Sequence, residues 1–281
     1  MSLTDAQWAR IEPLLPDRTP KRGGRWRDHR QVIDAIAFKY RTGTPWMDLP
    51  EEFGSWKGTH NRLRKWAADG TWEKVFTALL TQADAQGDLD GVVAVDSTMV
   101  RAHQHAAGAR PKGAPADEPH DHALGRSRGG LTTKIHLVAD GHCRPLAFHL
   151  TAGQAGDAPA FLHVMARLRV PRRIGRPRTT PDVILADKAY SSRAIRTHLR
   201  RRGIRAVIPQ PADQIATRKR RGRSGGRPPA FDRATYKQRN TVERGINKLK
   251  QWRGLATRYD KTAIIYLVGL HLAAIFIWTA T

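Results

Sequence analysis

Two short apolar stretches, each followed at once by an aspartate, constrain the fold more than any other feature of this sequence. Residues 92–95 and 183–186 contain only Val, Ile, Leu and Ala, and they precede Asp96 and Asp187. Apolar runs of this length are typical of strands that are buried on both faces of a sheet. Because segments with helical periodicity follow, the sequence predicts an α/β fold in which helices cover a sheet.

The two aspartates are candidate metal ligands. A carboxylate at the end of a buried strand is costly unless a cation or a hydrogen-bond donor compensates its charge. If the two strands are neighbours, the negative charges repel each other, and Mg²⁺ would relieve that repulsion. Each aspartate could instead cap the loop or helix that follows it. Only 12 Asp and Glu residues follow residue 90, and two of them occupy this position, which favours a site.

The rest of the chain supplies the other elements of this fold. Alternating or apolar runs predict strands, 3.6-residue periodicity predicts helices, and segments rich in Gly, Pro, Ala and charge predict loops. The expected elements are strands at 133–138, 145–150 and 206–208, helices at 158–169, 191–202 and 235–253, and basic loops at 104–130 and 211–230.

Residues 1–88 are predicted to form a separate, all-helical domain before the α/β domain at 89–281. Ser55 can cap a helix that ends near Gly70, after a preceding helix and a turn, as in a helix-turn-helix module. Many small helical domains have this pattern and bind nothing. The polar residues that we expect to contact DNA are Lys57, His60, Asn61, Arg64 and Lys65.

Net charge points to a polyanionic partner. The chain carries +24 at pH 7, and residues 167–258 hold 27 Lys and Arg against 5 Asp and Glu. A short basic run can serve only solubility or localisation, but several clusters over a structured region favour binding to DNA phosphates. The densest cluster, also expected to contact DNA, is Arg218, Lys219, Arg220 and Arg221. A single cysteine and the absence of a secretory signal predict a cytoplasmic location.

A third acid lies on the helix predicted at 235–253. At about 100° per residue, Tyr236, Arg239, Glu243 and Lys250 fall within one narrow polar stripe. An apolar stripe beside it can pack on the sheet, so the helix would aim Glu243 and two cations at one place. A solvated face with local ion pairs would show the same spacing.

These residues carry a family resemblance. The chain resembles bacterial insertion-sequence transposases of the DDE type, in the insertion-sequence-five group of the insertion-sequence-four-like superfamily. The spacing of Tyr236, Arg239, Glu243 and Lys250 matches the third-acid motif of that superfamily without departure. Ala189 stands where the family often has Gly, which a helical backbone should tolerate. Other segments that resemble the family are 95–98, 129–134, 186–190 and 258–261.

The resemblance implies a ribonuclease H-like catalytic domain preceded by a DNA-binding domain. Asp96, Asp187 and Glu243 would hold two Mg²⁺ ions, with Mn²⁺ as a substitute. Cleavage would free a 3′-hydroxyl at the end of the element, which would then attack target DNA. Tyr236, Arg239, Lys250 and Lys188 would support the DNA near the site. The implied DNA partners are the terminal inverted repeats and the target DNA. We also expect a homodimer or larger assembly that is associated with the bacterial nucleoid and not with a membrane.

The sequence also contains features that are compatible with a metal site, a membrane span or other functions. His103, His105, His120 and His122 form two pairs that could bind a metal, but we interpret them as loop residues. The uncharged segment 263–281 is predicted to be a buried helix rather than a membrane span. A ribonuclease H-like nuclease without strand transfer, or a non-catalytic DNA-binding descendant of a transposase, are the alternative functions.

Overall fold

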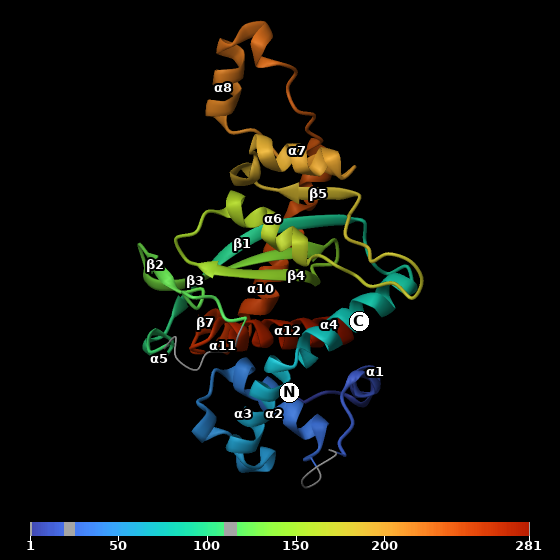
Figure 1. Cartoon of the computed structure of the whole chain (residues 1–281), viewed down its shortest axis with the longest axis vertical. Helices are drawn as coiled ribbons and strands as arrows, with labels where there is room; N and C mark the ends of the chain where they lie inside the picture. The colour runs from blue at the N-terminus through green and yellow to red at the C-terminus, as the bar shows by residue number, and fades with distance from the viewer. Residues whose placement is uncertain (1, 20–25, 110–116, 281) are drawn as a thin grey trace.

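The computed structural model describes residues 2–19, 26–109 and 117–280 (Figure 1). Part of the segment predicted as a loop at 104–130 therefore lies outside the described residues. The helices are α1 (Asp5–Ile11), α2 (His29–Thr42), α3 (Trp56–Ala68), α4 (Thr71–Ala85), α5 (Gln104–Ala107), α6 (Asp157–Arg167), α7 (Arg193–Arg201), α8 (Ala212–Arg220), α9 (Arg233–Tyr236), α10 (Asn240–Lys250), α11 (Arg253–Ala256) and α12 (Ala263–Thr279). The strands are β1 (Val92–Ala102), β2 (Gly125–Ser127), β3 (Gly130–Asp140), β4 (Pro145–Ala152), β5 (Val183–Ala186), β6 (Arg205–Val207) and β7 (Thr257–Arg258).

One mixed sheet forms the centre of the molecule. Its main strands lie in the order β4, β3, β1, β5, β6, with β2 beside β3 and β7 beside the end of β1. The hairpin β3–β4 and the pair β1–β3 are antiparallel, whereas β1, β5 and β6 run parallel. Three antiparallel strands followed by two parallel ones, with helices on both faces, is the ribonuclease H-like arrangement that the sequence analysis expected.

Strand β1 is longer than predicted. The apolar run 92–95 continues through Asp96 to Ala102, so Asp96 does not end the strand. What ends there is the parallel pairing, because Val95 opposite Ala186 is its last pair. Asp187 follows β5 directly, as predicted. The two acids therefore lie where β1 and β5 separate.

Helices cover the two faces of the sheet differently. Side chains alternate along a strand, so Asp96 and Ser97 point to opposite faces. Ser97 faces α6, since its Oγ bonds the first residue of that helix. Leu137, the register partner of Asp96, lies against Gly245 of α10 on the other face. The close approach at Gly245 brings α10, and with it Glu243, onto the Asp96 face.

The N-terminal helices and the sheet share one hydrophobic core. Tyr40 of α2 and Trp72 of α4 belong to the same buried cluster as Phe148 of β4 and Leu270 of α12. Helix α12 lies between the sheet and the N-terminal helices (Figure 1), and it is buried along most of its length, as predicted. No helix in the described part of the chain is both long and apolar enough to cross a membrane.

Three further segments differ from the sequence predictions. The expected loop at 211–230 contains α8 and a 3₁₀ turn at Gly222–Gly225, and it projects from the body beyond β5 and α7 (Figure 1). Likewise, the expected loop at 104–130 contains α5 and β2. The helix expected at 235–253 is divided, because a 3₁₀ turn at Lys237–Arg239 separates α9 from α10. Asp232 is the N-cap of α9, and α10 ends at Lys250.

Candidate active site

Asp96 occupies a shielded position on the α10 face of the sheet. Its side chain is 20% exposed, and one carboxylate oxygen accepts a hydrogen bond of 2.8 Å from the backbone N–H of Ser97. Burial raises the pKa of Asp96, the Ser97 N–H and the Arg239 guanidinium lower it in part, and Asp187 and Glu243 raise it further. A nearby cation would therefore stabilise the ionised form of Asp96, and the charges of Asp187 and Glu243 increase this effect.

Asp187 caps the turn that follows it and also lies near Asp96. Its carboxylate accepts a 2.7 Å hydrogen bond from the N–H of Ala189, at the start of a 3₁₀ turn over Lys188–Tyr190. The capping role that the sequence allowed is thus present. The backbone at Ala189 is helical, which is the condition under which a residue other than Gly was expected to be tolerated there. Lys188 is exposed beside it.

Arg239 links the first and third acids. Its Nη2 lies 2.5 Å from the Glu243 Oε1, one helical turn away, and its Nη1 lies 3.6 Å from the Asp96 Oδ2. Within the described residues, that Nη1 is buried and makes no hydrogen bond. The guanidinium therefore serves as the cation between two carboxylates that the sheet and α10 bring together.

The donor set fits Mg²⁺, although the side-chain arrangement is not that of a closed metal site. Three carboxylates and water are the ligands that Mg²⁺ prefers. Across residues 2–19, 26–109 and 117–280, no three His, Cys, Asp or Glu side chains lie close enough to hold a metal ion. This applies equally to the His pairs of the sequence analysis; His122 bonds Glu118 instead. For the three acids to bind metal, Arg239 has to yield its place between Asp96 and Glu243.

The predicted supporting residues lie around these acids. Tyr236 is half-buried against Phe231, and burial raises its pKa, with the three acids acting on the same hydroxyl. Lys250 donates to the Met99 carbonyl of β1 at 3.4 Å, and burial lowers the pKa of its ammonium group. Lys250 therefore flanks the open edge of β1 beyond Asp96, and Tyr236 lies near the three acids.

The predicted DNA-contact residues fall in two separate places. On α3, His60 packs on Trp46, and burial and then Arg64 lower its pKa. The other four α3 residues, Lys57, Asn61, Arg64 and Lys65, are exposed. On α8, Lys219, Arg220 and Arg221 are exposed and Arg218 is half-buried, on the projecting segment at the far end of the molecule from α3 (Figure 1).

Sequence reasoning missed one polar cluster near the acids. Ser97, Lys134 and Asp157 bond one another on the α6 face of the sheet. Asp157 begins α6, where an acidic residue is explained by the helix dipole alone, so no sequence signal marked it. The available signals were the position of Ser97 directly after Asp96 and the position of Lys134 in a segment that resembles the family.

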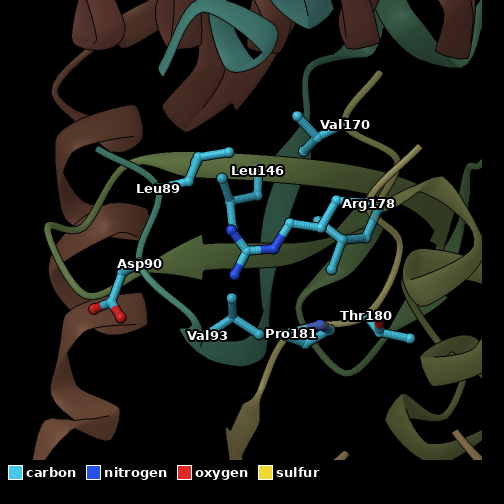
Figure 2. A pocket seen from close by; sticks show the side chains of 9 residues that line it. Leu89, Asp90, Val93, Leu146, Val170, Arg178, Thr180 and Pro181 are labelled. Carbon is cyan, nitrogen blue, oxygen red and sulfur yellow. The ribbon is translucent and has the colours of Figure 1, made fainter. Parts of the chain in front are cut away.

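A small cavity lies elsewhere and does not compete with this site. It measures about 20 Å³, enough for a single water molecule. Figure 2 shows mostly apolar side chains around it, and none of the three acids. Those labelled are Leu89, Asp90, Val93, Leu146, Val170, Arg178, Thr180 and Pro181.

Comparison with known proteins identifies the family. Residues 87–276 match the family described as "Transposase DDE domain", and residues 3–76 match "Putative transposase of IS4/5 family". The chain is 30% identical over 148 residues to "Putative transposase for insertion sequence element IS6501" of Brucella ovis, covering 53% of this chain and 98% of that protein. It is 32% identical over 169 residues to the corresponding protein of element IS402 of Burkholderia cepacia, covering 60% and 69%.

A looser likeness exists to a solved structure, the catalytic domain of Mos1 mariner transposase. Identity is 14%, with 73% of this chain and 92% of that chain covered, and the TM-score is 0.27. A TM-score this low does not establish a common fold, so the assignment depends on the family matches. These span both the helical region and the region that carries Asp96, Asp187 and Glu243, and the chain therefore belongs to the transposase DDE domain family.

Proposed function

We propose that this protein is an insertion-sequence transposase that cleaves DNA at the ends of its element and joins the freed 3′-hydroxyl to target DNA. The observation that carries the proposal is that Asp96 of β1 and Glu243 of α10 share the Arg239 guanidinium, while the charge of Asp187 at the end of β5 also acts on Asp96. Asp187 caps a turn and Glu243 pairs with Arg239, but neither role explains why both charges act on the half-buried Asp96 from distant parts of the chain.

The chain's own residues would bind and orient the reacting DNA. Asp96, Asp187 and Glu243 would hold two Mg²⁺ or Mn²⁺ ions, which when bound activate the attacking hydroxyl and stabilise the leaving 3′-oxygen. Arg239, released from Glu243, would contact a phosphate oxygen by its two-pronged donor set. Lys250, at the open edge of β1, would hold the end of the element. Each joining step exchanges one phosphodiester bond for another, so no nucleotide is consumed.

We further propose a division of labour between the helical and sheet regions. Residues 1–88 would read the terminal inverted repeat through α3, and residues 89–281 would cut and join. The projecting segment around α8 would contact phosphates without sequence preference. Because two ends must be brought together, we expect a dimer or larger assembly on DNA in the bacterial cytoplasm.

The test is metal-dependent nicking of DNA that carries the terminal inverted repeat, followed by a strand-joining assay. Asp96→Asn, Asp187→Asn and Glu243→Gln should each reduce nicking at least about 100-fold, because each removes a metal ligand. Asp213→Asn, which changes an exposed acid on α8, should nick like the parent. Equal nicking by all four variants would refute the site. Nicking without joined products would identify a nuclease instead.

The two DNA surfaces can be separated by salt dependence. Changing Lys219, Arg220 and Arg221 to Gln should weaken binding to every DNA sequence and reduce the slope of log K against log salt by up to about 3. Changing Asn61 and Arg64 to Ala should instead reduce the preference for the inverted repeat over random DNA. Identical effects of the two sets would contradict this division.

A further inference from the structure

A polar cluster lies beneath Asp96, on the opposite face of the sheet from α10. Ser97, the next residue of β1, donates from its Oγ to the Asp157 Oδ1 of α6 at 2.6 Å. Lys134 of β3 donates to the same Oδ1 at 3.0 Å and to the Ala155 carbonyl at 2.6 Å. The cluster thus joins β1, β3 and the start of α6 at a single carboxylate oxygen.

This cluster contacts β1 where the strand has lost a neighbour. Parallel pairing with β5 ends at Val95, and pairing with β7 begins at Arg101. Between these points, β1 pairs only with β3 among the described residues. A strand with one open edge twists more freely than one paired on both sides. Asp96 is the first residue of this open stretch, so its orientation depends on whatever holds Ser97.

The same helix also holds the segment after Asp187. Tyr190 is 1% exposed and packs on Phe161 of α6, with ring centres 5.8 Å apart. Burial raises the pKa of the Tyr190 hydroxyl strongly, and the charges of Asp157, Asp96 and Asp187 raise it further. All three carboxylates are therefore near this one hydroxyl. Helix α6 thus contacts the chain next to both acids.

Asp157 carries a charge that is balanced locally. Burial alone would raise its pKa, but hydrogen bonds from Ser97 and Lys134, and the charge of Lys134, lower it below its ordinary value. An ionised carboxylate paired with an ammonium group accepts a stronger hydrogen bond from Ser97 than a neutral group would. The Lys134 side chain is 12% exposed, so this pairing is largely shielded from solvent.

We infer that Asp157, acting through Ser97 and supported by Lys134, positions Asp96 for metal binding. The inference rests on the proposed function, since it treats Asp96 as a metal ligand. Asp157 touches neither the metal nor the DNA in this role; it sets the direction in which β1 presents the Asp96 carboxylate. Residues that orient a metal ligand typically change metal affinity about 10–100-fold when they are removed.

The experiment measures Mn²⁺ binding to the full chain without DNA, by electron paramagnetic resonance of free Mn²⁺, together with the Mn²⁺ dependence of nicking. Ser97→Ala and Asp157→Ala should each weaken Mn²⁺ binding about 10-fold. Ser97→Thr keeps the hydroxyl and should restore parental binding. Combining Ser97→Ala with Asp157→Ala should be no worse than either change alone, because both remove the same interaction.

Thr151→Val is the matched control. Thr151 hydrogen-bonds His136 at 2.9 Å in the same polar layer, and no hydrogen bond joins it to Ser97 or Asp157 in the described structure. This variant should lose comparable stability in urea and keep parental Mn²⁺ binding. The inference is overturned if the Ser97 and Asp157 variants bind Mn²⁺ like the parent, or if Thr151→Val weakens binding as much. A parent that binds no Mn²⁺ would instead overturn the proposed metal site itself, and the inference with it.

Discussion

Breaking a buried ion pair between α2 and the segment after β7 should destabilise the whole protein strongly. The Lys39 Nζ lies 3.6 Å from the Asp260 Oδ1, and the two side chains are only 4% and 7% exposed. Lys39 also lies over the rings of Tyr40 and Trp46, 4.2 Å and 5.5 Å from their centres. Lys39→Met and Asp260→Asn each remove one charge and leave the side-chain length or shape almost unchanged.

The two changes should not be equal. Removing one member of a buried ion pair costs about 3–5 kcal/mol, because the remaining charge stays in a poorly solvating environment. Asp260 faces a second buried cation, Arg258, which is 0% exposed and hydrogen-bonds the Asp260 carbonyl. Asp260→Asn removes a charge that acts on both Lys39 and Arg258, although the hydrogen bond from Arg258 to the backbone carbonyl stays, and it should cost about 3–5 kcal/mol. Lys39→Met leaves Asp260 near the Arg258 charge, so it should cost less than Asp260→Asn.

Urea unfolding with a double-mutant cycle measures these costs, and Arg18→Met is the control. Arg18 pairs with Asp28 at 2.9 Å, but the two side chains are 38% and 45% exposed, so its loss should cost about 0–1 kcal/mol. At about 2.1 cal/mol/K per residue over 281 residues, a loss of 4 kcal/mol lowers Tm by roughly 7 °C. The reasoning is refuted if Asp260→Asn costs no more than Arg18→Met, or if Lys39→Met is the more damaging change.

Four further substitutions test other parts of the structure. Burial lowers the pKa of His271 to about 3. As pH falls below about 6.5, this histidine therefore becomes protonated in the unfolded chain while it stays neutral in the folded chain. The free energy of unfolding should then decrease towards acid by up to about 1.4 kcal/mol per pH unit for this group, and His271→Leu should reduce the measured slope between pH 6 and 4. Gly254→Ala would place a Cβ 3.0 Å from the Tyr40 Cα and carbonyl oxygen and should cost about 1–3 kcal/mol in thermal unfolding. Gly58→Ala, on open α3 surface, should raise stability by up to about 1 kcal/mol; a loss at both glycines would contradict this. Arg239→Gln should destabilise the metal-free protein and give a larger Mn²⁺-induced rise in Tm than the parent shows, whereas an equal rise would show that the guanidinium does not occupy metal space.

The sequence predicted the order of elements well because local signals specified them. Gly43 ends α2 with a positive φ of 76°, as expected of a helix C-terminus. The apolar run 183–186 matches β5 residue for residue. The extension of β1 beyond Asp96 could not be read in the same way. Its residues there do not form an apolar run, since exposed Met99 precedes buried Val100, and they form a strand because β3 pairs with them as far as Arg101.

The contacts within the candidate site could be predicted only in part from the sequence, for a related reason. Spacing along one helix predicts that Arg239 and Glu243 are neighbours, and the structure has them 2.5 Å apart. Nothing local could predict that Arg239 also contacts Asp96, more than 140 residues earlier. The contact between Ser97 and Asp157 is equally non-local and depends on how α6 is seated on the sheet. Such contacts follow from tertiary packing, which periodicity does not encode.

The shared core has a consequence for how the enzyme would choose its cutting position. If α3 and the sheet belonged to independently moving domains, recognition of an inverted repeat would leave the cut site loosely determined. Instead, Tyr40 of α2 is fully buried, donates a hydrogen bond to the Ile265 carbonyl of α12 at 3.1 Å, and lies against Gly254. Helix α12 packs in turn on β4, and Trp278 near its end donates to the Pro145 carbonyl at 2.7 Å. A DNA end held by α3 would therefore meet Asp96 at a set distance, and loosening the α2 contact should broaden the distribution of nick positions before it abolishes nicking.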